Sequence, residues 1–219
     1  MTGTGCDIVA LKAINVDRTK QANFYSKIII TAEKSLYDEA LSAVVPFEHF
    51  VWLAWSVKES VYKFLQRGNP DLVFSPSKIN IKQLTVPAPI PSPAEETEGQ
   101  GFDNNRVYSG FIMYGDQQFY SRSTLNNDLI FSVVNDVDDF TATYWGIKKI
   151  DSSEPDVQSA AVRIFILNSL NSLFPGEGLR IEKSPYGYPM VLQNDTELPV
   201  IISFAHHDLW VAYSFVLNS

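Results

Sequence analysis

The sequence of residues 55–64 is WSVKESVYKF, and it lies within a longer segment, 47–68, whose apolar residues recur every three or four positions. These apolar residues are Phe47, Phe50, Val51, Ala54, Val57, Val61 and Phe64. Such a period is typical of an amphipathic helix that buries one face. Gly68 favours the end of a helix at that point. The segment therefore predicts a long helix with one face in a hydrophobic core.

Two charged side chains on this helix allow different interpretations. Glu59 and Lys63 are four residues apart, so on a helix they lie on the same face, one turn from each other. Ion pairs with this spacing are common on solvated helix surfaces, and on spacing alone we expect one here. The alternative is that the two residues form half of an active site, which only residues elsewhere in the chain can favour.

Strands are predicted on both sides of the long helix. Residues 6–14 (CDIVALKAI) are rich in β-branched residues, and residues 77–84 (SKINIKQL) alternate apolar and polar side chains. Residues 106–136 contain three strand-like segments separated by GD and NND, which predicts an antiparallel meander. Residues 19–41, with mixed charges and aromatic side chains, are expected to be helical.

The C-terminal third also mixes helix and strand. Residues 157–174 have a helical apolar face and follow Pro155, a favourable residue for a first helical turn. Residues 179–192 and 199–217 predict strand pairs around the YGYP and HHD turns.

The order of these elements predicts an α+β fold with two lobes, in which antiparallel sheets pack against helices. We expect the lobes to comprise residues 1–150 and 151–219. Residues 85–105 (TVPAPIPSPAEETEGQGFDNN) combine alternating prolines with acids and glycines. Such a composition cannot build a core, so an exposed, mobile loop is expected within the first lobe.

Composition narrows the classes of function. The formal net charge is −8 over 219 residues, which argues against a broad nucleic-acid interface because such interfaces need a basic surface. Cys6 is the one cysteine, so an internal disulfide framework and a cysteine-rich metal site are both excluded. The N-terminus has no basic head, and no apolar run is long enough to span a membrane, so a cytoplasmic protein is expected.

Three separated sites contain side chains that could act together. Asp7 is an acid inside an apolar strand, where an ionised carboxylate is costly unless a cation or hydrogen bonds compensate it. Glu59 lies beside Lys58 and Lys63, and His206 lies between two apolar strands. The carboxylates of Asp7 and Glu59 suit Mg²⁺, which takes one or two protein carboxylates and completes its shell with water and phosphate oxygens.

These motifs resemble those of the 4′-phosphopantetheinyl transferases. GCDIVAL (5–11) resembles their Gly-x-Asp-Ile element, WSVKESVYK (55–63) their Trp-x-x-Lys-Glu-(Ala/Ser)-x-x-Lys element, and SFAHH (203–207) their Ser-x-Ser-His element. FYSKIIITAEK (24–34) and the YGYP turn (186–189) are similar to two further segments of the family. The order and spacing of all five carry the resemblance.

The arrangement of the motifs resembles two branches of that family. The motif order is that of the short holo-acyl-carrier-protein synthases, which build their site between subunits. Residues 1–150 resemble the second half of the longer surfactin-synthetase-activating type, and residues 151–219 resemble the core of its first half. The resemblance thus implies a permuted, single-chain pseudo-dimer of two similar α+β lobes with the site between them. A monomer is expected, and a site shared between subunits stays open.

The resemblance also implies an activity. Such enzymes transfer the 4′-phosphopantetheine group of coenzyme A to a serine of an apo acyl or peptidyl carrier protein and release adenosine 3′,5′-bisphosphate. Coenzyme A and a carrier protein are therefore the expected partners, with no nucleic acid and no membrane. Fatty-acid, polyketide and peptide synthesis all stay open as the pathway served.

Roles for individual residues follow from the same resemblance. Asp7 and Glu59 are implied to bind Mg²⁺. Glu59, or a water that it orients, is implied to accept the proton of the carrier serine, and Lys63 to stabilise or protonate the departing phosphate. The contacts to coenzyme A implied in this way are His206, Ser203 and Lys58.

Three residues depart from the family pattern. Val9 stands where the longer type has a second acid, Ala205 replaces the second serine of the histidine motif, and Tyr188 replaces the lysine of a Gly-Lys-Pro turn. Lys183 or Arg180 could supply the missing charge. These departures keep open a non-catalytic module of the same fold that binds coenzyme A or a carrier protein. A metal-dependent nuclease is disfavoured because its Glu-x-Lys pair lies on a strand.

Each candidate also has a purely structural interpretation. Asp7 could cap a strand end, and His206 could be a hydrogen-bonded structural histidine. His207 and Asp208 are expected to form a turn. The three-dimensional arrangement has to decide between these interpretations and the functional ones.

Overall fold

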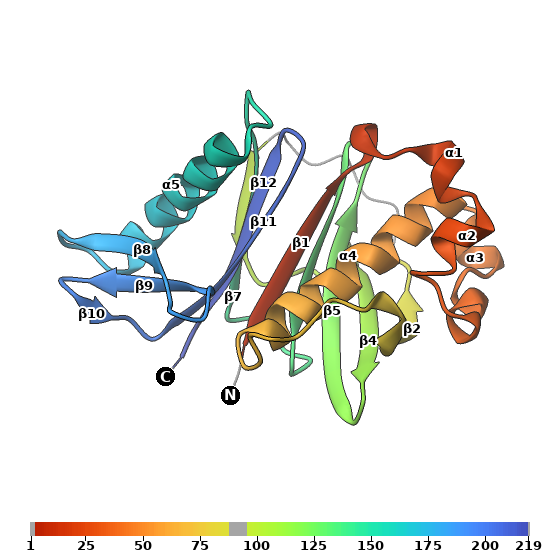
Figure 1. Ribbon diagram of the computed structural model, residues 1–219, viewed down its shortest axis with the longest axis horizontal. Helices are drawn as coiled ribbons and strands as arrows, with labels where there is room; N and C mark the ends of the chain where they lie inside the picture. Colours follow the sequence, from red (N-terminus) through yellow and green to blue (C-terminus); the bar gives the residue numbers. More distant parts are fainter. Residues whose placement is uncertain (1–2, 88–95, 219) are drawn as a thin grey trace.

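The computed structural model describes residues 3–87 and 96–218. A five-stranded antiparallel sheet with strand order β1-β6-β5-β4-β2 forms one side of the molecule (Figure 1). Its strands are β1 (Thr4–Ala10), β2 (Ile79–Thr85), β4 (Tyr108–Tyr114), β5 (Gln117–Leu125) and β6 (Leu129–Asn135). The strand predicted over 77–84 and the meander over 106–136 are confirmed. The first strand ends at Ala10, where the 3-10 turn η1 (Leu11–Ala13) follows.

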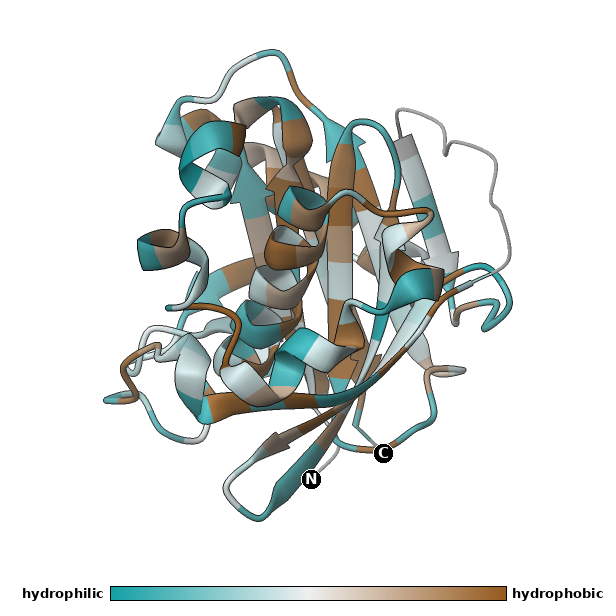
Figure 2. Ribbon diagram, turned by 90° about the vertical axis from the view of Figure 1, so that its right-hand side faces the viewer, coloured by the Kyte–Doolittle hydropathy of each residue, from teal (hydrophilic) through white to brown (hydrophobic). Residues whose placement is uncertain are grey.

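Helix α4 (Phe47–Gln66) packs on one face of this sheet, as the apolar period predicts. Figure 2 shows hydrophobic positions along the helix and along the strands behind it. The buried residues of the helix face are Phe50, Val51, Leu53, Ala54, Val57 and Val61, and they pack with Ile81, Ile112, Ile130 and Val134 of the sheet. The 3-10 turn η3 (Pro76–Lys78) then leads into β2.

Strand β1 and helix α4 approach each other closely at one point. A Cβ atom added to Gly5 would collide with the carbonyl oxygen of Ser60 and lie 2.9 Å from the backbone nitrogen of Phe64. Only glycine therefore permits this contact. It brings Asp7, two residues further along β1, to the helix turn that carries Glu59.

The segment predicted as helical over 19–41 is helical only in short pieces. These are α1 (Val16–Thr19), α2 (Ala22–Tyr25), the 3-10 helix η2 (Thr31–Leu36) and α3 (Glu39–Ser42). Asn15 and Asp38 accept hydrogen bonds from the backbone N–H groups of Arg18 and Leu41, which explains where α1 and α3 begin.

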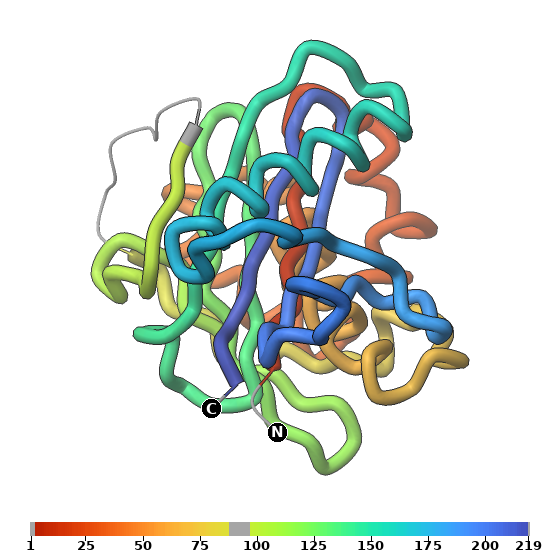
Figure 3. Tube along the Cα trace, turned by 90° about the vertical axis from the view of Figure 1, so that its left-hand side faces the viewer, coloured from red at the N-terminus to blue at the C-terminus, as the bar shows by residue number. Residues whose placement is uncertain are grey.

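A second antiparallel sheet, with strand order β11-β12-β7-β3, lies on the other side of β1. Its strands are β3 (Glu96–Gln100), β7 (Thr143–Lys149), β11 (Val200–His207) and β12 (Trp210–Leu217). Helix α5 (Pro155–Leu173) runs across the face of this sheet that is turned away from β1 (Figure 3). A small sheet follows, made of β8 (Leu179–Lys183), β9 (Pro189–Gln193) and β10 (Thr196–Glu197). No helix within the described ranges is long and apolar enough to cross a membrane.

Strand pairing differs from the sequence interpretation at two points. Strand β3 lies inside the expected loop of residues 85–105 and pairs with β7; residues 88–95 of that loop lie outside the described residues. Backbone hydrogen bonding at a sheet edge needs no apolar side chains, so the polar composition did not prevent a strand. Strands β3 and β7 also belong to the sheet of the C-terminal hairpin, so the sheets do not divide at residue 150.

The two sheets meet where the edge of β1 faces β11. The backbone N–H of Cys6 donates a hydrogen bond to Ser203 Oγ at 3.0 Å, and the N–H of Ala10 donates to His207 Nδ1 at 3.0 Å. Side chains of β11 thus satisfy edge groups of β1 that its sheet partner β6 does not reach. The buried Ala205 packs between these two contacts. The junction therefore fixes β11 against the strand that carries Asp7.

Candidate active site

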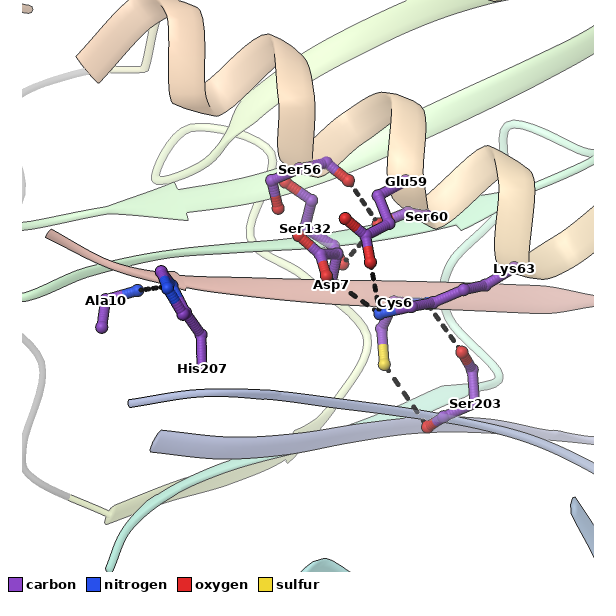
Figure 4. A network of polar contacts seen from close by, with 10 residues as sticks. All are labelled: Cys6, Asp7, Ala10, Ser56, Glu59, Ser60, Lys63, Ser132, Ser203 and His207. Atoms are coloured by element: carbon purple, nitrogen blue, oxygen red, sulfur yellow. Dashed lines mark hydrogen bonds and ion pairs between the residues drawn. The ribbon is translucent and has the colours of Figure 1, made fainter. Parts of the chain in front are cut away.

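Asp7 and Glu59 converge on the ammonium group of Lys63 (Figure 4). Asp7 comes from the middle of β1, and the other two come from consecutive turns of α4. Lys63 Nζ lies 2.9 Å from Asp7 Oδ1 and 3.5 Å from Glu59 Oε1. The Asp7 side chain is 7% exposed and that of Glu59 is 27% exposed. Glu59 and Lys63 are therefore not an isolated surface pair, because a buried acid from another element joins them.

The cluster contains two carboxylates and one ammonium group. Burial, opposed by the charge of Lys63 and reinforced by that of Glu59, raises the pKa of Asp7 to about 6. Burial alone would lower the pKa of Lys63, but the charges of Asp7 and Glu59 outweigh it and raise that pKa. Two carboxyl groups therefore share one ammonium group in a partly buried place, which favours a further cation.

The chemistry of these donors fits a magnesium ion. Asp7 Oδ2 is buried and makes no hydrogen bond of good geometry among the described residues, although the Ser56 hydroxyl lies close enough to lower the pKa of Asp7. An oxygen placed in this way is costly unless a ligand compensates it. Carboxylate oxygens are the protein ligands that Mg²⁺ prefers, and one or two of them suffice. Within residues 3–87 and 96–218, no three His, Cys, Asp or Glu side chains form a metal-binding group. Asp7 and Glu59 would therefore be the protein ligands, with water and substrate oxygens completing the shell.

A cleft of about 480 Å³ opens beside the cluster. Cationic or titratable nitrogen groups from α4, α5, β8 and β11 line it: Lys63, Arg67, Arg163, Lys183 and His206. None of its described lining residues is acidic. In a chain whose net charge is −8, this concentration of basic groups favours an anionic ligand.

His206 faces this cleft from β11. Burial, together with the charges of Lys63 and His207, lowers the pKa of His206. The lowered pKa favours the neutral imidazole, which can gain a proton when an anion binds beside it. Ser203 lines the same cleft, and its hydroxyl accepts the hydrogen bond from the Cys6 N–H. A serine hydroxyl can also donate one hydrogen bond, and the Cys6 thiol competes with a ligand for it.

Lys58 does not reach the cleft, and the expectation that it contacts coenzyme A is corrected here. Its side chain has no exposed surface. Its ammonium group lies 2.7 Å from Glu33 Oε2 and donates a hydrogen bond to the Ile28 carbonyl at 2.6 Å. Successive residues of a helix point about 100° apart, so Lys58 and Glu59 face different parts of the structure. Lys58 instead fixes the segment before α3 to the long helix.

Some cationic residues of the cleft were not found from the sequence. Arg67 is four residues after Lys63, so the helical spacing that identified Lys63 could also have identified Arg67. Arg163 comes from α5, and no pattern in the sequence connects it with the other residues. Lys183, one of two candidates for the missing charge, lines the cleft. The other, Arg180, is bound to two carboxylates at 2.7 Å and does not line it.

The departures from the family pattern lie in different surroundings. Val9 is buried in the core beneath α4, and Ala205 is buried against β1. A serine hydroxyl at position 205 would therefore face the apolar junction rather than the cleft. Tyr188, in contrast, lines the cleft directly. His207 ends β11 and holds the β1 edge through Ala10, so its role here is structural.

Comparison with known proteins identifies the first part of the chain. Residues 3–107 match the family model of the 4′-phosphopantetheinyl transferase superfamily. The matched range contains Asp7, Glu59 and Lys63, the three residues that converge, whereas His206 lies outside it. No curated protein and no solved structure matches the chain significantly. The superfamily implies a transferase acting on phosphopantetheine. Residues 3–107 are therefore similar to the 4′-phosphopantetheinyl transferase superfamily.

Proposed function

We propose that this protein transfers the 4′-phosphopantetheine group of coenzyme A to a serine of an apo acyl or peptidyl carrier protein, with Mg²⁺ as cofactor. The serine oxygen attacks the phosphorus that bears the pantetheine arm. The bond from that phosphorus to the bridging oxygen breaks, and adenosine 3′,5′-bisphosphate leaves with the bonding electrons. The observation that supports this reaction best is the convergence of Asp7 and Glu59 on Lys63, which in turn lines a cationic cleft.

Asp7, Glu59 and Lys63 have different roles in the proposed reaction. Asp7 and Glu59 would hold Mg²⁺, which when bound neutralises charge that grows on the phosphate oxygens. Glu59 is the more exposed of the two acids, so it is the one that the carrier serine, or a water beside it, can reach to give up a proton. The raised pKa of Lys63 keeps its ammonium group charged. Lys63 therefore stabilises the departing phosphate by charge and hydrogen bonding rather than by releasing a proton.

The cleft suits the donor. Coenzyme A carries a diphosphate and a separate phosphate monoester, and an anion of this kind needs several cationic contacts. Lys63, Arg163 and Lys183 supply permanent charge, while Ser203 and His206 supply hydrogen-bond donors. A volume of about 480 Å³ is also in the range of small-molecule sites.

The reaction is tested by weighing the carrier protein. The protein is incubated with coenzyme A, Mg²⁺ and each apo carrier protein of the host, and the carrier is weighed intact by mass spectrometry. We expect one carrier to gain the mass of phosphopantetheine, and the gain to disappear when EDTA is added. Binding of coenzyme A without transfer to any carrier would contradict the proposal and favour a non-catalytic module of the same fold.

The lowered pKa of His206 gives a prediction about proton uptake. The lowered pKa favours a neutral His206 before the donor binds, and a phosphate beside the imidazole raises that pKa, so binding of coenzyme A should take up part of a proton. Affinity should therefore increase as the pH is lowered from 8 to 7. Calorimetry in buffers with different ionisation heats measures this uptake, and His206→Gln should remove the contribution. Equal proton uptake by both proteins would show that His206 does not contact the phosphate.

A further inference from the structure

Arg67 lies at the end of α4, one helical turn beyond Lys63, and among the described residues it forms no ion pair, although the charge of Glu197 acts on it from a greater distance. The guanidinium carbon lies 4.4 Å from the ring centroid of Tyr188, and Nη1 donates a hydrogen bond to the carbonyl oxygen of Pro189 at 3.3 Å. A ring face and a neutral carbonyl hold the group in place without cancelling its charge. Arg122 and Arg180 differ from it, because each contacts a carboxylate at 2.7 Å.

Tyr188 belongs to a turn that backbone hydrogen bonds hold together. The N–H of Ser184 donates to the carbonyl oxygen of Tyr188 at 2.8 Å, and the N–H of Gly187 donates to that of Ser184 at 2.9 Å. Gly187 has a φ of 91°, which favours glycine, so the turn depends on this residue. These bonds hold the backbone of the turn between β8 and β9, and the Tyr188 ring faces the Arg67 guanidinium without a ligand being present.

Arg67 and Tyr188 also mark a boundary between two cavities. Both residues line the cationic cleft, and both line a second cleft of about 740 Å³ whose wall is mostly apolar. Arg67 thus lies where the cationic lining ends. Four residues of helix separate Arg67 from Lys63, which is about 6 Å along the helix axis. A ligand with one phosphate at Lys63 would need a second, outlying phosphate to use Arg67 as well.

We propose that Arg67, oriented by Tyr188, binds the phosphate monoester of the coenzyme A donor and selects donors that carry it. The inference rests on the proposed function and adds a specificity-determining residue to it. A guanidinium stacked on a ring keeps its N–H edge available for two parallel hydrogen bonds to phosphate oxygens. Tyr188 stands in the YGYP turn where the family pattern has a lysine. Arg67, at the end of α4, places a positive charge beside this position.

The test compares coenzyme A with 3′-dephospho-coenzyme A, which lacks only the monoester. Calorimetric binding to the wild-type protein should favour coenzyme A by about 10- to 100-fold. Arg67→Ala should lose a similar factor for coenzyme A and little for the dephospho form, so the preference disappears. Arg67→Lys should be intermediate, and adding Tyr188→Lys to Arg67→Ala should restore part of the preference. Arg180→Ala, a change of an arginine outside the cleft, is the matched control and should bind both donors like the wild type.

The outcomes separate this inference from the proposed function. If Arg67 has only a structural role, Arg67→Ala weakens binding of both donors equally, and the inference is overturned. If Arg67→Ala is folded and keeps the wild-type preference, the inference is also overturned, while transfer of phosphopantetheine by the wild type still supports the proposed function. If the wild type binds neither donor, both the inference and the proposed function are wrong.

Discussion

Replacing Glu59 with glutamine is expected to lower kcat for carrier loading by about 1000-fold or more. The amide keeps the size of the side chain but can neither accept the serine proton nor serve as an anionic ligand for Mg²⁺. Asp7→Asn should have an effect of similar size through metal binding alone. Rates are measured from the intact mass of the carrier at saturating coenzyme A, so that a loss of kcat is distinguished from a weaker KM.

A matched control separates chemistry from stability. Glu48→Gln changes a glutamate in the first turn of the same helix, where it pairs with Lys20 at 3.4 Å, well before the turn of Glu59. This variant should load the carrier at the wild-type rate. All variants should keep the wild-type circular dichroism. Wild-type turnover by Glu59→Gln would refute the role of Glu59 as base and metal ligand.

Removing Glu33 is expected to destabilise the fold by about 3–5 kcal/mol, because it leaves the ammonium group of Lys58 buried without a partner. Both side chains are almost completely buried, at 1% and 0% exposure. Glu33 Oε1 also accepts the N–H of Ile81 at 2.8 Å and Oε2 that of Ile30 at 2.9 Å, so Glu33→Ala breaks contacts to β2 and η2 together. The free energy of unfolding, measured by urea titration, reports the loss.

Two comparisons make this prediction specific. The double variant Glu33→Ala with Lys58→Met removes both charges, so it should regain part of the stability that the single variant loses. Asp128→Ala removes an exposed partner of Lys12, an ion pair of similar length, and should change stability little. A small loss in Glu33→Ala would mean that the Lys58–Glu33 pair does not anchor the segment before α3.

The sequence predicted best those features that depend on local periodicity. The apolar spacing around residues 55–64 located α4 almost to its ends, and the alternating segments located the meander. Strand β3 was missed because its partner β7 lies far along the chain. The local composition of residues 96–100 does not indicate that pairing. Residues 19–41 were predicted to be helical throughout. In the structure, side-chain caps and turns divide this region into short helices.

The candidate site was predicted only in part. The resemblance paired Asp7 with Glu59 and Lys63, and the structure brings these three together. Lys58 was grouped with Glu59 because the two are adjacent in sequence, although neighbours on a helix point in different directions. The cationic cleft joins α4, α5, β8 and β11, and only the packing of the two sheets at β1 and β11 brings those elements together.

The proposed metal site holds one divalent ion between the carboxylates of Asp7 and Glu59. It is tested most directly by titrating the protein with Mn²⁺, a paramagnetic substitute for Mg²⁺, and following the free ion by electron paramagnetic resonance. We expect one bound ion per wild-type chain and at least tenfold weaker binding after either Asp7→Asn or Glu59→Gln. Equal binding by all three proteins, or no binding by the wild type, would contradict it.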